Sequence, residues 1–132
     1  MLKDIKGRSA TLVSVSNKTQ IINIWATWCA PCRYEMPSLD NLQKLLGPED
    51  YSVVGVSIDD DDHLVREFLI ERKIKFTNYL DENMSEIKEK VGIRVLPSTI
   101  IVSPQGKLLK LVEGGVEWDQ PEMVAMIREL NL

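Results

Sequence analysis

Cysteine and histidine are scarce in this chain of 132 residues, which has two cysteines, Cys29 and Cys32, and one histidine, His63. A scaffold held by several disulfides is therefore excluded, and a structural zinc site with four Cys or His ligands would lack one ligand. No apolar stretch is long enough to span a bilayer. The segment Met1–Gly7 also lacks the apolar core of a signal peptide. A chain trimmed after a leader or membrane anchor would look the same.

Basic residues are in the minority. The 16 Lys and Arg stand against 20 Asp and Glu, which gives a net charge of −4, so nucleic acid is not an expected partner. Hydrophobic residues make up 44% and charged residues 27%, as in soluble globular proteins. The length suits one domain over residues 1–132, without repeats or a low-complexity linker. We expect a monomer.

The two cysteines belong to one short motif, Trp28-Cys29-Ala30-Pro31-Cys32, which follows the apolar run 21–25. The run predicts a buried strand, and the residues after it predict a helix. A Cys-x-x-Cys at a strand-to-helix junction is typical of a thioredoxin-like redox site.

The spacing suits thiol chemistry. Cys29 and Cys32 are one helical turn apart, so their side chains share a helix face. Cys29 lies at the helix N-terminus, where free N–H groups and the helix dipole favour a thiolate. Lowering a thiol pKa from about 8.5 to about 7 needs roughly 2 kcal/mol, which a partly buried helix terminus can supply. Pro31 is tolerated in the first turn because its missing N–H would have no partner there.

Two other interpretations of the cysteine pair stay open. One is a structural disulfide, although so short a loop contributes only about 2 kcal/mol in the chain-entropy model. The other is half of a zinc site, for which His63 is the only further Cys or His ligand.

The pattern along the chain predicts an α/β fold. The expected strands cover 10–15, 20–26, 51–58, 76–80, 98–103 and 107–113, and the expected helices cover 29–46, 62–73, 83–91 and 119–130. The strands 20–26 and 51–58 flank a helix and should be parallel, whereas the last two strands should form an antiparallel hairpin. The apolar positions expected to face the core of the first two helices are Leu39, Leu42, Leu45 and Leu46, and then Leu64, Val65, Phe68 and Leu69.

Acidic and aromatic residues at the element boundaries suggest structural roles. The run Asp59–Asp62 is expected to be a solvated cap for the next helix, with a partner-docking or cation-binding role as the alternative. The sequence 119–122 should cap the final helix. Trp25 is expected in the core and Trp118 in packing at a helix start.

This order of elements resembles thioredoxin, and the chain is most similar to the TlpA/ResA-like thiol–disulfide oxidoreductases, which include cytochrome c maturation reductants. The resemblance rests on the sequence Trp-Ala-Thr-Trp-Cys-Ala-Pro-Cys-Arg-Tyr-Glu-Met-Pro at 25–37, on the sequence Val-Leu-Pro-Ser-Thr at 95–99, and on an extra helix and strand around 59–80. It implies a thioredoxin-like fold with a central mixed β-sheet flanked by helices and a helix–strand insertion around 59–80.

The resemblance implies roles for the cysteines and for Pro97. Cys29 would be the attacking thiol and Cys32 the resolving thiol. Pro97 would be a cis-proline lying against the disulfide, and the backbone of Leu96 would pair with a substrate peptide in strand-like fashion. The alternative for Pro97 is an ordinary trans proline that opens a strand.

The same resemblance implies that Trp28 and Pro31 form part of the docking surface for substrate. For Trp28 the alternative is a partly buried core aromatic.

Glu35, one turn after Cys32, matches a glutamate with which this family tunes its thiols. Asn23 stands where ordinary thioredoxins carry a buried aspartate, and Asn takes no proton at neutral pH. We therefore expect Glu35 to handle the proton of Cys32. The alternative is a solvated Glu35 paired with Arg33 or Lys6.

The function expected is dithiol–disulfide exchange with protein substrates, acting as a reductant, without metal, flavin or nucleotide. The resemblance implies a membrane-embedded thiol carrier as electron donor and a periplasmic or other extracytoplasmic location, although the cytoplasm stays open. Alternatives are a general thioredoxin, an oxidant or isomerase on the same fold, a peroxidase-like relative, and a metal-binding or docking module without turnover.

Overall fold

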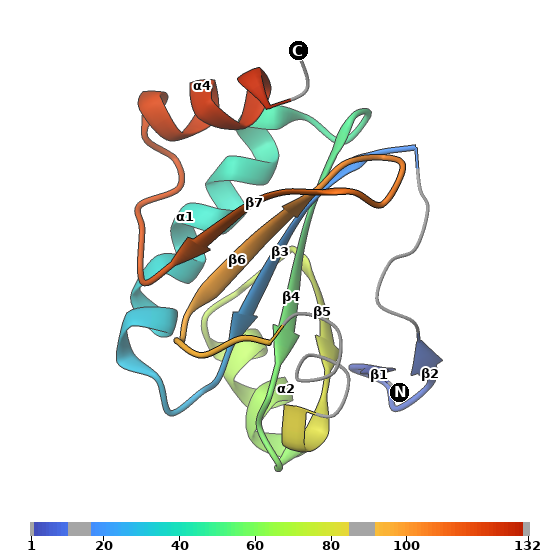
Figure 1. The fold of residues 1–132 in the computed structure, drawn as a ribbon. Helices are drawn as coiled ribbons and strands as arrows, with labels where there is room; N and C mark the ends of the chain where they lie inside the picture. Colours follow the sequence, from blue (N-terminus) through green and yellow to red (C-terminus); the bar gives the residue numbers. More distant parts are fainter. Residues whose placement is uncertain (1, 11–16, 85–91, 131–132) are drawn as a thin grey trace.

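The computed structural model describes residues 2–10, 17–84 and 92–130. Within these residues seven strands form one mixed sheet in the order β2-β1-β5-β4-β3-β6-β7 (Figure 1). The strands are β1 Leu2–Asp4, β2 Ser9–Ala10, β3 Thr19–Trp25, β4 Tyr51–Ser57, β5 Thr77–Leu80, β6 Ser98–Val102 and β7 Leu108–Glu113. The helices are α1 Ala30–Leu46, α2 Asp62–Glu71 and α4 Pro121–Glu129, together with the 3-10 helix η1 Glu82–Met84.

The strand β3 lies inside the sheet and carries the chain to the cysteine motif. It pairs in parallel with β4 and antiparallel with β6. All seven of its residues are buried, which explains its nearly continuous apolar sequence. The predicted parallel pair and the predicted β6–β7 hairpin are both confirmed.

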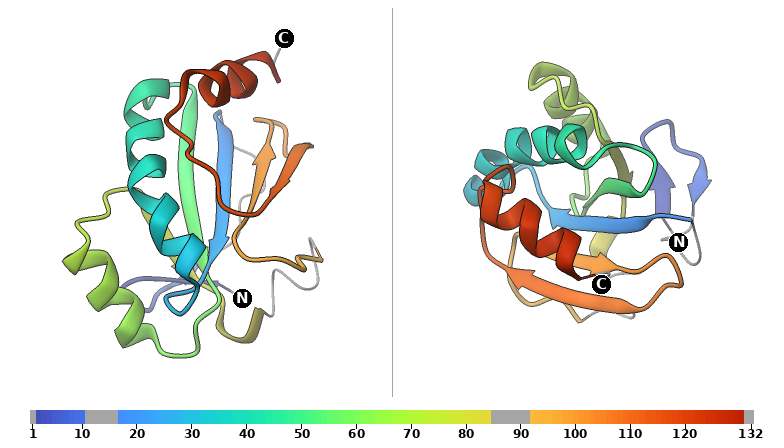
Figure 2. Two further views of the ribbon diagram at one scale, coloured as in Figure 1. Left: turned by 90° about the vertical axis from the view of Figure 1, so that its left-hand side faces the viewer. Right: turned by 90° about the horizontal axis from the view of Figure 1, so that it is seen from above.

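The helices α1 and α2 cover the same face of the sheet (Figure 2, left). On that face Asn23 of β3 is hydrogen-bonded to Glu35 of α1. The ring of Trp25, two residues further along β3, lies 5.3 Å from the ring of Phe68 in α2. The predicted helix–strand insertion at 59–80 is therefore confirmed as α2 and β5, and β5 extends the sheet beyond β4. The expectation that Trp25 lies in the core is also confirmed.

Two leucines expected in the core are exposed. Leu39, Leu42 and Leu46 of α1 are buried, but Leu45 is 52% exposed because it falls beside that stripe on the helix surface. In α2, Val65 and Leu69 are buried while Leu64 is 48% exposed.

The short strands at the N-terminal end were not predicted. A strand as short as β1, with three residues, carries no readable alternation, and it is held by pairing with β2 on one side and β5 on the other. Of the strand predicted over 10–15, Ala10 belongs to β2 and residues 11–15 lie outside the described residues. Of the helix predicted over 83–91, residues 85–91 lie outside them as well.

The capping prediction is right for α2, and for α4 the helix begins within the predicted segment, with Pro121 in its first turn, but without a side-chain cap. Asp61 caps α2 by accepting from the backbone N–H groups of His63 and Leu64. The N-cap of α4 is Gln120, whose side chain makes no cap hydrogen bond, and the carboxylate of the preceding residue, Asp119, accepts from the side chain of Asn41. Among the described residues, none of the helices combines the length and apolar character that a transmembrane segment needs.

Candidate active site

Cys29 and Cys32 are joined by a disulfide at the N-terminus of α1. Cys29 is the N-cap residue, with extended backbone angles of φ −98° and ψ 109°. The backbone N–H of Cys32 donates to the sulfur of Cys29 over 3.3 Å. The Cα atoms of the two cysteines are 5.3 Å apart. The sulfur of Cys29 therefore accepts a hydrogen bond from one of the N–H groups that have no backbone partner at a helix N-terminus.

The two sulfurs differ in how far a reagent can reach them. The Cys29 residue is 7% exposed and Cys32 is fully buried. An incoming thiol or disulfide can therefore meet only the Cys29 side of the pair.

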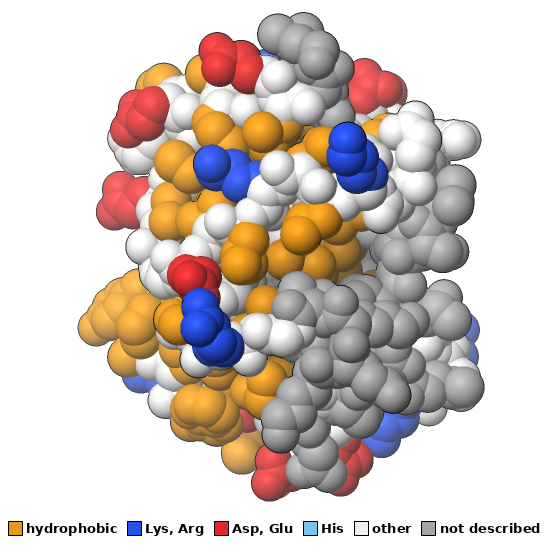
Figure 3. Space-filling model, viewed as in Figure 1, with side chains coloured by type: hydrophobic (Ala, Val, Ile, Leu, Met, Phe, Trp, Pro, Cys, Tyr) orange, Lys and Arg blue, Asp and Glu red, His pale blue; other side chains and the backbone are white. Residues whose placement is uncertain are grey.

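Exposed apolar side chains surround this point. Trp28 is 66% exposed and Tyr34 is 84% exposed, so the alternative of Trp28 as a core aromatic is wrong. Figure 3 shows hydrophobic side chains gathered where Figure 1 places the beginning of α1. Beside them a cavity of about 380 Å³ is lined by residues that include Pro31, Tyr34, Glu35 and Val116.

The loop before β6 contains a cis peptide bond between Leu96 and Pro97, as the resemblance implied. Pro97 is buried and Leu96 is half-buried. The carbonyl of Pro97 accepts from the backbone N–H of Gly114 over 2.8 Å, and the hydroxyl of Ser98 donates to the carbonyl of Val95 over 2.6 Å. These bonds tie the loop to β6 and to the chain that leaves β7.

A buried carboxylate holds the loop that leads into the cysteine motif. Asp59 is 3% exposed, so its expected place in a solvated cap is wrong. It accepts from the backbone N–H of Thr27 at 3.0 Å and from the hydroxyls of Thr27 and Ser57, each at 2.6 Å. On the other side of this loop, Arg33 donates to the carbonyl of Thr27 over 2.8 Å. Thr27 is therefore clamped between β4 and α1, two residues before Cys29.

Glu35 is a second buried carboxylate, 3% exposed, and it joins four parts of the fold. Its Oε1 accepts from the side-chain amide of Asn23, which also donates to the hydroxyl of Thr99 in β6 over 3.0 Å. Its Oε2 accepts from the backbone N–H of Val116 at 3.1 Å and from the indole N–H of Trp118 at 3.2 Å. The alternative of a solvated Glu35 paired with Arg33 or Lys6 is wrong.

Burial raises the pKa of the Glu35 carboxyl above its ordinary value, although the hydrogen bonds from Val116, Asn23 and Trp118 act in the opposite direction. Asn23 is a suitable partner for a carboxyl group that can be protonated or ionised. Its Oδ1 is buried and has no hydrogen-bond partner among the described residues. Rotation of the amide by 180° would present that oxygen to a protonated Glu35, so Asn23 can serve either state of the carboxyl.

The structure thus brings Cys29, Cys32 and Glu35 to one end of α1, and the sequence analysis had singled out all three. The sequence analysis had not linked Asp59 or Trp118 to the site. Fully buried Trp118 meets Glu35 from 83 residues further along the chain, a contact that no local pattern announces. Within the part of the chain that the structure describes, no group of three or more His, Cys, Asp or Glu side chains is arranged to hold a metal ion.

The mixed sheet, the cysteine pair at the start of α1 and the cis-proline loop define a thioredoxin-fold protein with a dithiol–disulfide pair. The chain belongs to the Redoxin family, whose model matches residues 2–127.

Named relatives agree with this assignment. The chain is 29% identical over 120 residues to the thiol-disulfide oxidoreductase ResA of Oceanobacillus iheyensis, covering 91% of this chain and 62% of the relative. With ResA of Bacillus subtilis it shares 28% identity over 114 residues, covering 86% of this chain and 63% of the relative. The chain thus spans less than two thirds of the length of these relatives.

Solved structures share the fold. The MTB protein dsbF, solved in mixed oxidized and reduced forms, matches with a TM-score of 0.81 and 26% identity, over 97% of this chain and 92% of dsbF.

Proposed function

We propose that this protein is a thiol–disulfide oxidoreductase that reduces disulfides of protein substrates. The observation that carries the proposal is the asymmetry of the Cys29–Cys32 pair. Cys29 keeps a slight exposure of 7% and its sulfur accepts a hydrogen bond at a helix N-terminus, whereas Cys32, one turn deeper, is fully buried. This arrangement favours a thiolate at Cys29 and keeps Cys32 for the second step.

The exchange proceeds in two displacements. The Cys29 thiolate attacks one sulfur of a substrate disulfide, forming a mixed disulfide and releasing the other substrate sulfur as a thiolate. Cys32, after losing its proton, then attacks the Cys29 sulfur. This step releases the second substrate thiol and forms the Cys29–Cys32 disulfide seen in the structure. The substrate gains two electrons and the enzyme loses two.

The docking surface follows from what surrounds Cys29. We place the substrate chain along the Leu96–Pro97 loop, with the backbone of Leu96 pairing in strand-like fashion and the exposed rings of Trp28 and Pro31 flanking the scissile disulfide.

Glu35 is the proposed proton acceptor for Cys32. It is buried and lies one helical turn further along α1 than Cys32. Burial raises its pKa towards neutral pH, and a proton acceptor works best when its pKa is close to the operating pH. Titration of the Cys29 thiolate in Glu35→Gln tests this role. A shifted thiolate pKa and a slower second step are expected, and an unchanged pKa with an unchanged rate would remove Glu35 from the mechanism.

The return of electrons and the cellular setting are parts of the same proposal. The oxidised pair must be reduced again by an external dithiol, for which we propose a membrane-embedded thiol carrier. We propose that the protein works as a monomer in an extracytoplasmic compartment. Support comes from a fold relative described as a secreted Mycobacterium tuberculosis disulfide oxidoreductase, which matches with a TM-score of 0.77 at 20% identity over 94% of this chain and 92% of that one.

The decisive test combines redox equilibration with trapping. In glutathione buffers the Cys29–Cys32 couple should equilibrate near the reducing end of the range, towards about −270 mV rather than about −120 mV. Cys32→Ser should accumulate a mixed disulfide with a model substrate, whereas Cys29→Ser should not react.

Other outcomes would identify other functions. A potential near the oxidising end would favour an oxidant or isomerase, and consumption of peroxide would favour a peroxidase. Cysteines that stay inert to alkylating reagents under reducing conditions, or that hold a metal ion, would overturn the proposal.

A further inference from the structure

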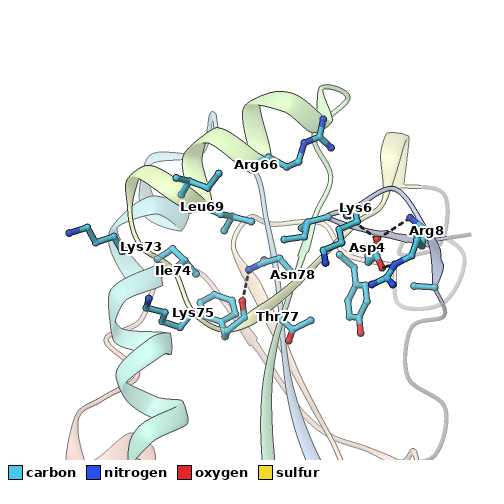
Figure 4. A pocket seen from close by; sticks show the side chains of 15 residues that line it. Asp4, Lys6, Arg8, Arg66, Leu69, Lys73, Ile74, Lys75, Thr77 and Asn78 are labelled. Carbon is cyan, nitrogen blue, oxygen red and sulfur yellow. Dashed lines mark hydrogen bonds and ion pairs between the residues drawn. The ribbon is translucent and has the colours of Figure 1, made fainter.

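A second concave site lies away from the disulfide, between the C-terminal half of α2, the beginning of β5 and the turn that joins β1 to β2 (Figure 4). We call it the basic groove. Its volume is about 830 Å³, within the usual range of ligand-binding cavities. Trp28, Cys29, Cys32 and Pro97 do not line it. An occupant of the basic groove would therefore leave the accessible side of the disulfide free.

The walls of the basic groove are strongly cationic although the protein is acidic. Five of the 16 basic residues of the chain line it, against one of the 20 acidic residues. The acid, Asp4, is already neutralised by Arg8, whose Nε lies 2.7 Å from its carboxylate. The other four cations form no ion pair with any described residue, namely Lys6, Arg66, Lys73 and Lys75. Figure 4 shows Lys73 and Lys75 on one side of the groove and Lys6 and Arg8 on the other.

The floor of the basic groove is apolar and borders the sheet at the beginning of β5. Leu69, Ile74 and Phe76 contribute apolar surface. The strand β1 pairs with β5 only at Tyr79 and Leu80. The first two residues of β5, Thr77 and Asn78, pair with β4 on one side, and no described strand pairs with them on the other. Thr77 is exposed, whereas Asn78 is only 3% exposed, so an extended chain can reach this edge of the sheet at Thr77.

One cation of the groove is kept at a conformational cost. Lys73 follows α2 with a positive φ of 55°, a region in which glycine is the usual residue and other side chains are strained. Its amide donates to the carbonyl of Ile70, and the next amide, from Ile74, donates to the carbonyl of Leu69, which closes the end of the helix. Glycine would close it with less strain.

We propose that the basic groove binds an extended acidic peptide segment of a partner protein, with carboxylates facing the exposed side chains of Lys6, Lys73 and Lys75 and with the peptide backbone reaching the exposed sheet edge at Thr77. The exposed edge at Thr77 favours a peptide over other anions, because a peptide supplies N–H and C=O groups as well as carboxylates. An anionic membrane surface fits less well, since the cations lie on two sides of a cavity and not on one flat surface (Figure 4).

The net charge makes the proposal easy to distinguish from non-specific attraction. A protein of net charge −4 repels an acidic peptide overall and attracts a basic one. Binding of an acidic peptide must therefore come from a local basic site.

The test uses the oxidised full chain and a fluorescein-labelled peptide, Glu-Val-Glu-Val-Glu-Val, followed by anisotropy. We expect binding that weakens as salt is raised, and no binding of the Lys-Val-Lys-Val-Lys-Val peptide at this site. The double substitution Lys73→Glu, Lys75→Glu should reduce the affinity at least tenfold. Amide shifts in NMR spectra should centre on Thr77.

A matched control separates the groove from net charge. Lys107→Glu with Lys110→Glu makes the same change in charge on the β6–β7 hairpin, where both side chains are exposed. This control should keep the affinity within about twofold, in line with weak long-range electrostatics between exposed charges. Equal losses in both double variants, or stronger binding to the basic peptide, would overturn the proposal. Binding to vesicles that contain phosphatidylglycerol without binding to the acidic peptide would overturn it in favour of a membrane surface.

Discussion

The surroundings of Glu35 and the basic groove handle charge in opposite ways. At Glu35 a single carboxylate is enclosed by the fold and receives three hydrogen bonds from Asn23, Val116 and Trp118. In the basic groove, four cations have no ion pair among the described residues, and three of them, Lys6, Lys73 and Lys75, are exposed to solvent. Because Glu35 is enclosed, its pKa is raised, and its hydrogen bonds contribute to the stability of the fold. Exposure leaves the second region available to an external partner.

Substitutions in the enclosed region should therefore change stability and its pH dependence, and substitutions in the groove should change binding. One residue links the groove to the core. Asn78 lines the groove, and its Oδ1 accepts from the indole N–H of Trp25 at the end of β3.

The largest effect is expected for Gly55→Ala in β4, where a side chain would break the hydrogen bond between Trp25 and Asn78. An added Cβ would lie 2.8 Å from Cγ of Asn78 and closer still to its Oδ1, so the Trp25 hydrogen bond would be lost inside the core. We expect a destabilisation of about 3–4 kcal/mol in urea unfolding.

Gly115→Ala is the matched control for this substitution. There the new Cβ would meet Pro31 at 3.5 Å, an ordinary contact, and the change should stay within about 0.5 kcal/mol. Equal losses in the two variants would show that the contact with Asn78 is not what Gly55 protects.

The next effect in size is expected for Asp59→Ala. It removes the acceptor of the Thr27 backbone, the Thr27 hydroxyl and the Ser57 hydroxyl in a buried place, which should cost about 2–3 kcal/mol. The exposed neighbour Asp60→Ala should change stability by less than about 0.5 kcal/mol. A comparison of the two unfolding curves decides whether the first acid of the run acts as a clamp or as part of a solvated cap.

Local patterns predicted the parts of the fold that local physics decides. The strand at 20–26 was readable because β3 is buried along its whole length, and the cysteine motif was readable because both sulfurs lie within one helical turn. The leucine errors have the same origin, since Leu45 and Leu64 are apolar but fall beside the buried stripes of their helices.

The rest of the site depends on contacts between distant segments. Asp59 meets Thr27 from 32 residues away, and Trp118 meets Glu35 from 83 residues away. No periodicity or spacing marks such pairs. The resemblance to a known family supplied Glu35 and Pro97 as candidates, but it did not show that Glu35 joins β3, β6 and the segment after β7.

A smaller effect, with a defined sign, is expected from the pH dependence of Glu35→Gln. Because the folded pKa of Glu35 is raised above the ordinary 4.5, folding favours its protonated form. The stabilising contribution of wild-type Glu35 is therefore fully present below pH 4.5 and is lost as the pH rises through the folded pKa. The Glu35→Gln variant does not titrate at this position, so its stability relative to the wild type should increase over that interval.

The measurement is urea unfolding of the oxidised proteins across the interval, so that thiols do not contribute. Glu117→Gln makes the same chemical change at an exposed position and should run parallel to the wild type. If the curve of Glu35→Gln also ran parallel to the wild type, burial would not raise the pKa of Glu35.

The smallest effect is a gain in stability, and it comes from the groove. In Lys73→Gly the relief of the positive φ should outweigh the larger backbone entropy of glycine in the unfolded chain, giving about 0.5–1 kcal/mol of added stability. The control Lys75→Gly changes a nearby lysine of the groove that has no positive φ, and it should give no gain. The same Lys73→Gly variant should bind the acidic peptide more weakly, so one substitution would raise stability and lower binding. That combination is expected where a fold keeps a strained residue for contact with a partner. If Lys73→Gly were no more stable than the wild type, or bound the acidic peptide equally well, Lys73 would not be a strained residue that serves binding.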